Sequence, residues 1–257
     1  MRLMKRILSA AAVLALSASL LVGCSSTASS VPASASSAAE STVSSVEETA
    51  SSAVDENEAA AAQLLNDLTG SYQELWPVIL ADEYKQTWLD DCTALVGEEN
   101  AEAAFEKLSS MVTSDVYGED AVEAYANGGG AYFCGFTNSL ATLTFDGETS
   151  TISGTDKDGN VLFSHTYHYI GMEPVHELYE FESDDADSGE FTYFFLAPDT
   201  SAETYHIEFR YGSDAEALSQ YDAGEYAYWV ASGISTDCDQ TMIDNCIELF
   251  CTENLAG

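Results

Sequence analysis

Four histidines have the clearest capacity for chemistry in this 257-residue chain: His165, His168, His176 and His206. Imidazole nitrogens and carboxylate oxygens are common ligands of zinc and similar divalent ions. Between Thr204 and Tyr211 the residue types alternate as in a strand, which places His206 and Glu208 on one face where they can converge on a cation. Arg210 falls on the same face and is expected to pair with Glu208 and oppose a metal. The simpler alternative is that His206 is an ordinary strand histidine, hydrogen-bonded within the protein or exposed to solvent.

The other histidines are weaker candidates. His165 and His168 lie three residues apart on a predicted strand, Val161–Ile170, so they point to opposite faces and make a poor chelating pair. His165 falls on the apolar, aromatic face and is expected to line a cavity or core. His168 and His176 are expected at the surface. Each of these three histidines can serve as a ligand only if a neighbouring strand brings it to the site of His206 and Glu208.

The pattern of the chain changes near residue 130. Helical spacing of apolar residues predicts helices at Glu56–Leu68, Tyr84–Val96, Ala101–Val112, Glu119–Tyr125, Ala215–Gln220 and Gln240–Thr252. Strand patterns separated by turn residues predict strands at Ala131–Phe136, Leu140–Phe145, Thr149–Ser153, Val161–Ile170, Glu177–Phe181, Phe191–Leu196 and Thr204–Tyr211. Successive strands without intervening helices indicate an antiparallel meander that closes on itself, a small barrel or sandwich with helical flanks.

The first residues indicate export and lipidation. A basic start, Met1–Arg6, precedes an apolar run of 16 residues that is short for a membrane span. Leu21-Val22-Gly23-Cys24 resembles a bacterial lipobox, which implies cleavage before Cys24 and lipidation of its thiol. We therefore expect a lipoprotein signal peptide at 1–23, the lipidated Cys24 with a flexible Ser/Ala-rich tether at 24–55, and a folded domain at 56–257. The expected location is extracytoplasmic, at the cell surface or in the periplasm, with a lipid anchor as the sole membrane attachment.

Charge and motif content exclude several classes of function. From Cys24 onward, four basic residues against 44 acidic ones give a charge of −40, which repels nucleic acids. No nucleophile–base motif, phosphate loop or H-E-x-x-H motif occurs, so we expect a binding protein and not an enzyme. A hydrolase using Glu and His ranks last. Five cysteines remain after lipidation, an odd number that is compatible with buried thiols or with one or two disulfides.

Several segments, in order, resemble the ZinT (YodA-type) family of extracytoplasmic zinc-binding proteins, whose domain also ends the zinc-uptake lipoprotein AdcA. The matching segments are Gly70–Pro77, Thr166–Gly171, Tyr179–Glu182, Ala197-Pro198, Tyr205–Ile207 and Met242–Phe250. The resemblance implies a calycin-like (lipocalin-type) antiparallel β-barrel with helical flanks. It implies zinc, or another divalent metal, as the ligand, and capture or delivery of that metal for uptake or homeostasis. A metal ABC transporter is the partner this function would serve.

The same resemblance implies a degenerate metal site. The family's first ligand position falls on Phe194, and its His-x-His motif becomes Thr204-Tyr205-His206. The hairpin is one residue longer, which brings Glu203 near the missing position. The candidate ligands are thus His206, Glu208, Glu203, His165, His168 and His176. The alternative is a calycin-like barrel that has lost tight zinc binding and binds a small organic ligand or a partner protein.

Overall fold

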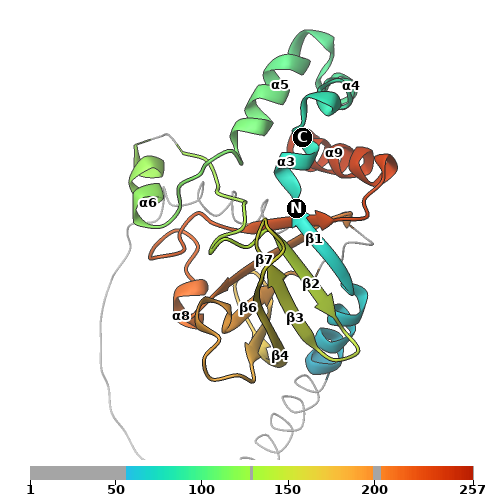
Figure 1. The fold of residues 1–257 in the computed structure, drawn as a ribbon. Helices are drawn as coiled ribbons and strands as arrows, with labels where there is room; N and C mark the ends of the chain where they lie inside the picture. The colour runs from blue at the N-terminus through green and yellow to red at the C-terminus, as the bar shows by residue number, and fades with distance from the viewer. Residues whose placement is uncertain (1–55, 128–129, 199–203, 257) are drawn as a thin grey trace, which may run out of the picture.

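The computed structural model describes residues 56–127, 130–198 and 204–256 (Figure 1). The predicted signal peptide, the predicted tether and Cys24 lie outside the described residues, and so does Glu203. Eight strands close into one antiparallel barrel, each paired with the next along the chain and β8 paired with β1. They are β1 (Gly70–Glu74), β2 (Thr142–Asp146), β3 (Thr151–Thr155), β4 (Val161–Met172), β5 (Tyr179–Ser183), β6 (Tyr193–Leu196), β7 (Ile207–Gly212) and β8 (Ala231–Ser235). The prediction of a calycin-like antiparallel barrel with helical flanks is confirmed.

The predicted helices are present, with their ends shifted by a few residues. Residues 56–67 are helical. The labelled helices are α3 (Leu75–Ile79), α4 (Lys85–Val96), α5 (Glu98–Ser110), α6 (Glu119–Ala126), α8 (Ala215–Leu218) and α9 (Gln240–Leu255), with short 3-10 turns η1 (Asp82–Tyr84) and η2 (Gly189–Phe191). At the start of α9, the Asp239 carboxylate accepts a hydrogen bond from the Met242 N–H at 2.9 Å. This is a standard N-cap and explains why the helix begins there.

The barrel interior is packed with aromatic rings. Phe163 and Tyr167 enter it from β4, Phe194 from β6, and Phe209 and Tyr211 from β7, and none is more than 4% exposed. The Phe194 ring centroid lies 5.9 Å from that of Phe163 and 5.4 Å from that of Tyr167. Because β4 and β6 are not neighbours, these contacts run across the interior. The barrel therefore holds a solid core at this level and no open cup.

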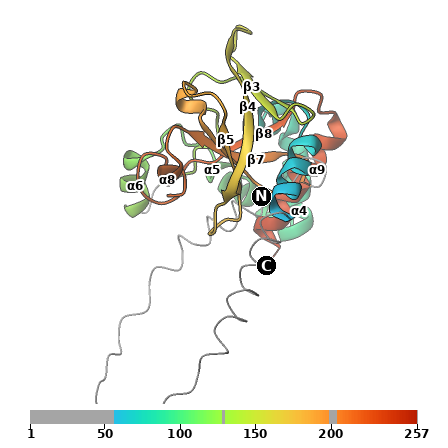
Figure 2. The same cartoon turned by 90° about the horizontal axis from the view of Figure 1, so that it is seen from below.

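Four helices gather outside the barrel around one tryptophan. Figure 1 shows α3, α4, α5 and α9 together above the barrel, and Figure 2, seen from below, shows α4 beside α9. Trp88 of α4 is fully buried there, and its indole N–H donates to the Ile79 carbonyl at 2.7 Å. Its ring makes an edge contact with Phe250 of α9, at 5.6 Å between centroids. This cluster fixes α4 against α9 independently of the barrel core.

The strand predictions fail in three places. Residues 131–136 form no labelled strand. Phe133 makes only isolated bridges, to Thr113 and Trp229. Conversely, β1 and β8 were not predicted, because Gly70–Glu74 and Ala231–Ser235 are rich in small or polar residues with low strand propensity. These two strands pair with each other and complete the barrel, so their conformation is decided by long-range pairing.

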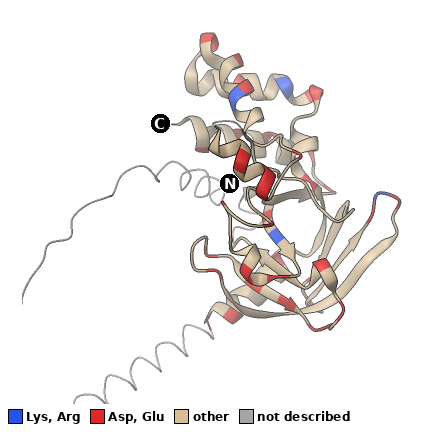
Figure 3. Ribbon diagram, turned by 90° about the vertical axis from the view of Figure 1, so that its left-hand side faces the viewer, with Lys and Arg blue, Asp and Glu red and all other residues tan. Residues whose placement is uncertain are grey.

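Acidic side chains are spread over the helical part and the barrel alike, with few basic ones between them (Figure 3). This distribution agrees with the charge read from the sequence. Among the described residues, no helix combines the length and apolar character needed to cross a bilayer.

Candidate functional site

His165 and His168 occupy opposite faces of β4, as predicted. His165 faces inward at the barrel end, and its Nδ1 lies 2.7 Å from the Asp185 carboxylate. The side chain of His168 is 52% exposed, and its Nδ1 lies 2.7 Å from the Asp184 carboxylate. The two imidazoles therefore pair with separate carboxylates on opposite sides of the sheet, and the structure does not bring them to a common cation.

His176 is buried, contrary to the prediction that it lies at the surface. It belongs to a turn in which the Glu173 carboxylate accepts the N–H groups of Val175 at 2.9 Å and His176 at 2.6 Å. Its ring packs on Tyr221, with 3.7 Å between centroids, and its Nδ1 is 3.3 Å from Glu173. Burial by itself raises the pKa of Glu173, but the hydrogen bonds from His176 and Val175 outweigh it and lower that pKa. His176 thus supports a local turn.

His206 and Glu208 are the two candidates that the structure brings together. His206 Nε2 lies 3.8 Å from Glu208 Oε1, and both side chains are almost completely buried. The Nδ1–H of His206 donates to the Thr204 carbonyl at 2.5 Å. A carbonyl can only accept, so this bond fixes the proton on Nδ1 and turns Nε2 toward the carboxylate. Backbone-anchored imidazoles of this kind are typical of metal ligands.

This pair lies on the outer side of the barrel wall. Along β7, Phe209 and Tyr211 point into the interior, so the alternate residues Glu208 and Arg210 point outward. Phe194 pairs in register with Tyr211 and contacts its ring, at 5.3 Å between centroids. Phe194 therefore points away from His206 and Glu208, and a histidine at that position would not face the same cation.

Burial affects two thiols near Glu208. It raises the pKa of the thiols of Cys134 and of Cys246 in α9, and the Glu208 carboxylate raises both further. Glu208 pairs in register with Ser232 of β8, whose N–H donates to the Cys134 carbonyl at 3.0 Å. The candidate pair is thus enclosed by β8, the segment around Cys134 and α9.

Arg210 does not pair with Glu208, contrary to the prediction. Its fully buried guanidinium donates to the carbonyls of Leu218, Gln220 and Tyr226, and its Cζ lies 4.2 Å from the centre of the Tyr221 ring. No carboxylate of the described residues lies within ion-pair distance of it. Arg210 therefore holds the 218–226 segment against β7, and it leaves Glu208 facing His206.

Within residues 56–127, 130–198 and 204–256, no three His, Cys, Asp or Glu side chains gather closely enough to hold a metal. The described part of the chain thus supplies two donors, His206 and Glu208. The remaining candidates His165, His168 and His176 lie elsewhere, and the placement of Glu203 is outside the described residues.

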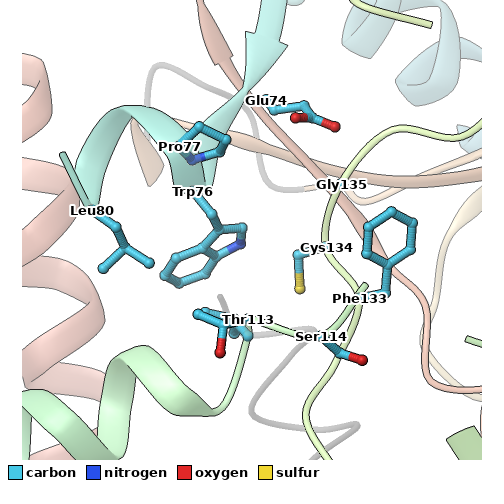
Figure 4. Close-up of a pocket in the computed structure, with 10 residues that line it drawn as sticks. Glu74, Trp76, Pro77, Leu80, Thr113, Ser114, Phe133, Cys134 and Gly135 are labelled. Atoms are coloured by element: carbon cyan, nitrogen blue, oxygen red, sulfur yellow. The ribbon is translucent and has the colours of Figure 1, made fainter. Parts of the chain in front are cut away.

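A separate pocket of about 300 Å³ lies beside α3 (Figure 4). Its walls are mostly apolar and include Trp76, Pro77, Leu80 and Phe133, with the Glu74 carboxylate at its edge. The indole N–H of Trp76 is buried beside the Cys134 thiol, where it offsets part of the rise in pKa that burial causes in that thiol. The sequence did not predict this pocket, because it joins segments at 74–80, 112–114 and 133–135 that no local pattern connects.

No protein-family model matches the chain, and no curated protein matches it. Among solved structures, it is similar to the Zn(II)-bound ZinT-like domain of AdcA from Streptococcus pneumoniae, with a TM-score of 0.46 and 14% identity over 72% of this chain and 89% of that one. It is also similar to full Zn(II)-bound AdcA from the same organism, with a TM-score of 0.42 and 14% identity over 71% of this chain and 34% of that one. Similarities of this size assign no ligand and no site residue to this chain.

Proposed function

We propose that this chain is a lipid-anchored extracytoplasmic protein that binds a divalent metal ion, with zinc as the ion to test first. The observation that carries the proposal is the buried pair His206–Glu208, with its imidazole fixed by the Thr204 carbonyl. The proposed role is capture or delivery of the metal for uptake or homeostasis, without catalysis.

The pair has a spacing that a metal can bridge. Two ligands of a tetrahedral zinc ion, each about 2.1 Å from the metal, lie about 3.4 Å apart. The observed separation of 3.8 Å between Nε2 and Oε1 is within a small side-chain movement of that value. Because zinc sites use three or four protein ligands, the proposal requires further donors, and Glu203 is the sequence candidate for one of them.

The N-terminal sequence supports the proposed location. The basic start, the apolar run and Leu21-Val22-Gly23-Cys24 follow the order of a lipoprotein signal, and the Ser/Ala-rich tether would hold the domain away from the membrane. A metal ABC transporter is the proposed recipient of the captured ion.

The first experiment is calorimetric titration of Zn²⁺ into the full metal-free chain in detergent at physiological salt. We expect one site of submicromolar affinity in the wild type. His206→Ala should weaken it by at least about tenfold, and Glu208→Gln, which preserves the shape of the side chain, should also weaken it. Acidification should lower the affinity, because protons compete with the metal for Nε2.

His168→Ala is the matched control, because it removes an exposed imidazole that is paired with Asp184. This variant should bind zinc as the wild type does. Equal affinity in the wild type and in both site variants would refute the assignment to His206 and Glu208. Weak binding at many sites that added salt abolishes would show that the acidic surface merely attracts cations.

The pocket beside α3 favours a second candidate function, the binding of a small organic ligand. Its volume of about 300 Å³ is at the lower end of the range for ligand sites, and its apolar walls with one carboxylate suit a small apolar molecule carrying a positive charge. The filled barrel interior leaves this pocket as the better location for such a ligand within the described residues.

Native mass spectrometry of the full chain tests this second function. We expect the wild type to retain a bound small molecule and Thr113→Trp to lose it, because Thr113 is exposed at the pocket and an indole there would fill the space. Thr149→Trp makes the same substitution on the exposed β2–β3 turn and should retain the ligand. An unliganded wild type, or equal retention in both variants, would count against the pocket.

A further inference from the structure

Two buried cysteines meet where α4 packs on α9. The Sγ atoms of Cys92 and Cys251 lie 3.9 Å apart, and both residues are fully buried. Among the described cysteines, this is the one pair whose sulfur atoms are in contact; Cys134, Cys238 and Cys246 make no such pair.

We infer that Cys92 and Cys251 form a disulfide bond in the mature protein and that this bond clamps α4 to α9. A disulfide sulfur–sulfur bond is about 2.05 Å long, so the two Sγ atoms need to approach by roughly 1.9 Å. Rotation of the two side chains and a small adjustment of the helices can supply this movement.

The helices are already held at the required distance by their neighbours. Trp88, one turn before Cys92, contacts Phe250, the residue preceding Cys251, with 5.6 Å between ring centroids. The bond would therefore form within an existing contact between α4 and α9 and would not have to draw two separate elements together.

The chemistry is ordinary thiol–disulfide exchange with an external disulfide such as oxidised glutathione. One cysteine thiolate attacks the external disulfide, forms a mixed disulfide and releases one thiol. The second cysteine thiolate then displaces the other external thiol. In sum, the two cysteine thiols lose two protons and two electrons, one sulfur–sulfur bond forms, and the external disulfide is reduced to two thiols.

Burial of the two thiols determines at which stage of folding this reaction can occur. It raises the pKa of both thiols, with Cys251 the more affected, so the reactive thiolates are scarce in the folded state. The bond should form while the chain folds, and a reductant should reach it only when the chain unfolds. The inference rests on the extracytoplasmic location proposed above, which provides an oxidising compartment.

The test is peptide mapping of the purified full chain, denatured with iodoacetamide and no reductant in the presence of a chelator. Trypsin together with a glutamate-specific protease cuts after Lys85 and Glu98 around Cys92, and after Glu248 and Glu253 around Cys251. The cut at Glu248 also separates Cys246 from Cys251. We expect the two peptides to be joined, two hydrogens lighter than their sum, with Cys134, Cys238 and Cys246 alkylated.

A stability measurement provides the matched control. The link spans 159 residues, so its reduction should lower Tm by about 10 °C. Cys246→Ser should keep this sensitivity to reductant, and the Cys92→Ala/Cys251→Ala double variant should lose it. Alkylation of both Cys92 and Cys251 in the wild type, or a link from either to another cysteine, would overturn the inference. Because no metal is present, either result leaves the zinc proposal unaffected.

Discussion

Replacing Phe194 with histidine is expected to lower the free energy of unfolding by about 3 kcal/mol and to leave zinc affinity unchanged. The Phe194 ring is fully buried among Phe163, Tyr167, Phe209 and Tyr211, so an imidazole there would leave a void and lack hydrogen-bond partners. It would also point into the barrel, away from His206. Urea denaturation and zinc titration of the full chain measure the two effects.

Phe194→Leu is the control for this result, because it keeps an apolar side chain and should cost only about 1 kcal/mol. The comparison separates two interpretations of the same residue. If Phe194 occupies a lost ligand position beside His206, as the family resemblance implies, restoring histidine should strengthen zinc binding. A gain in zinc affinity of tenfold or more would show that the outward placement of His206 and Glu208 is wrong.

Replacing Arg210 with methionine is expected to lower the free energy of unfolding by about 4 kcal/mol. The guanidinium is fully buried and supplies hydrogen bonds to three carbonyls of the 218–226 segment. Burial lowers the pKa of Arg210, and the carbonyl dipoles and the Tyr221 ring offset that desolvation. Methionine would fill much of the volume and leave those carbonyls without their donor.

Two variants show whether the effect belongs to this site. Arg210→Lys retains the charge but cannot reach three carbonyls with one planar group, so it should lose about half as much stability as Arg210→Met. Lys157→Met removes a charge at a side chain that is 85% exposed, and it should change stability by less than about 0.5 kcal/mol. A loss below about 1 kcal/mol in Arg210→Met would contradict the anchoring role.

The candidate metal pair was predictable from the sequence, but its surroundings were not. Alternation along one strand is enough to place His206 and Glu208 on a common face. The same alternation placed Arg210 beside them and predicted an ion pair. In the structure, the carbonyls of 218–226 take up the guanidinium instead, because the chain folds back over β7. Whether a strand residue meets a side chain or a returning loop is not encoded in its local pattern.

The burial of His176 and the contact of Cys92 with Cys251 show the same limit. His176 packs on Tyr221, and Cys92 contacts Cys251, which is 159 positions away in the sequence. Both contacts join distant parts of the chain, so no local sequence pattern indicates either of them. The exposed pairing of His168, in contrast, follows from its place on the polar face of β4. Local periodicity indicates which face of an element a residue occupies. What lies against that face depends on how the elements pack.

By itself, the sequence determined the strongly acidic surface, most of the helices, six of the barrel strands and the inward or outward direction of their side chains. These properties depend on composition and on spacing within one element. The tertiary structure alone decided that β1 and β8 are strands, that residues 131–136 are not, and that the barrel interior is filled. When the barrel closes, even a segment of low strand propensity forms backbone hydrogen bonds along both of its edges. These hydrogen bonds stabilise the strand, and their partners lie far away in the chain.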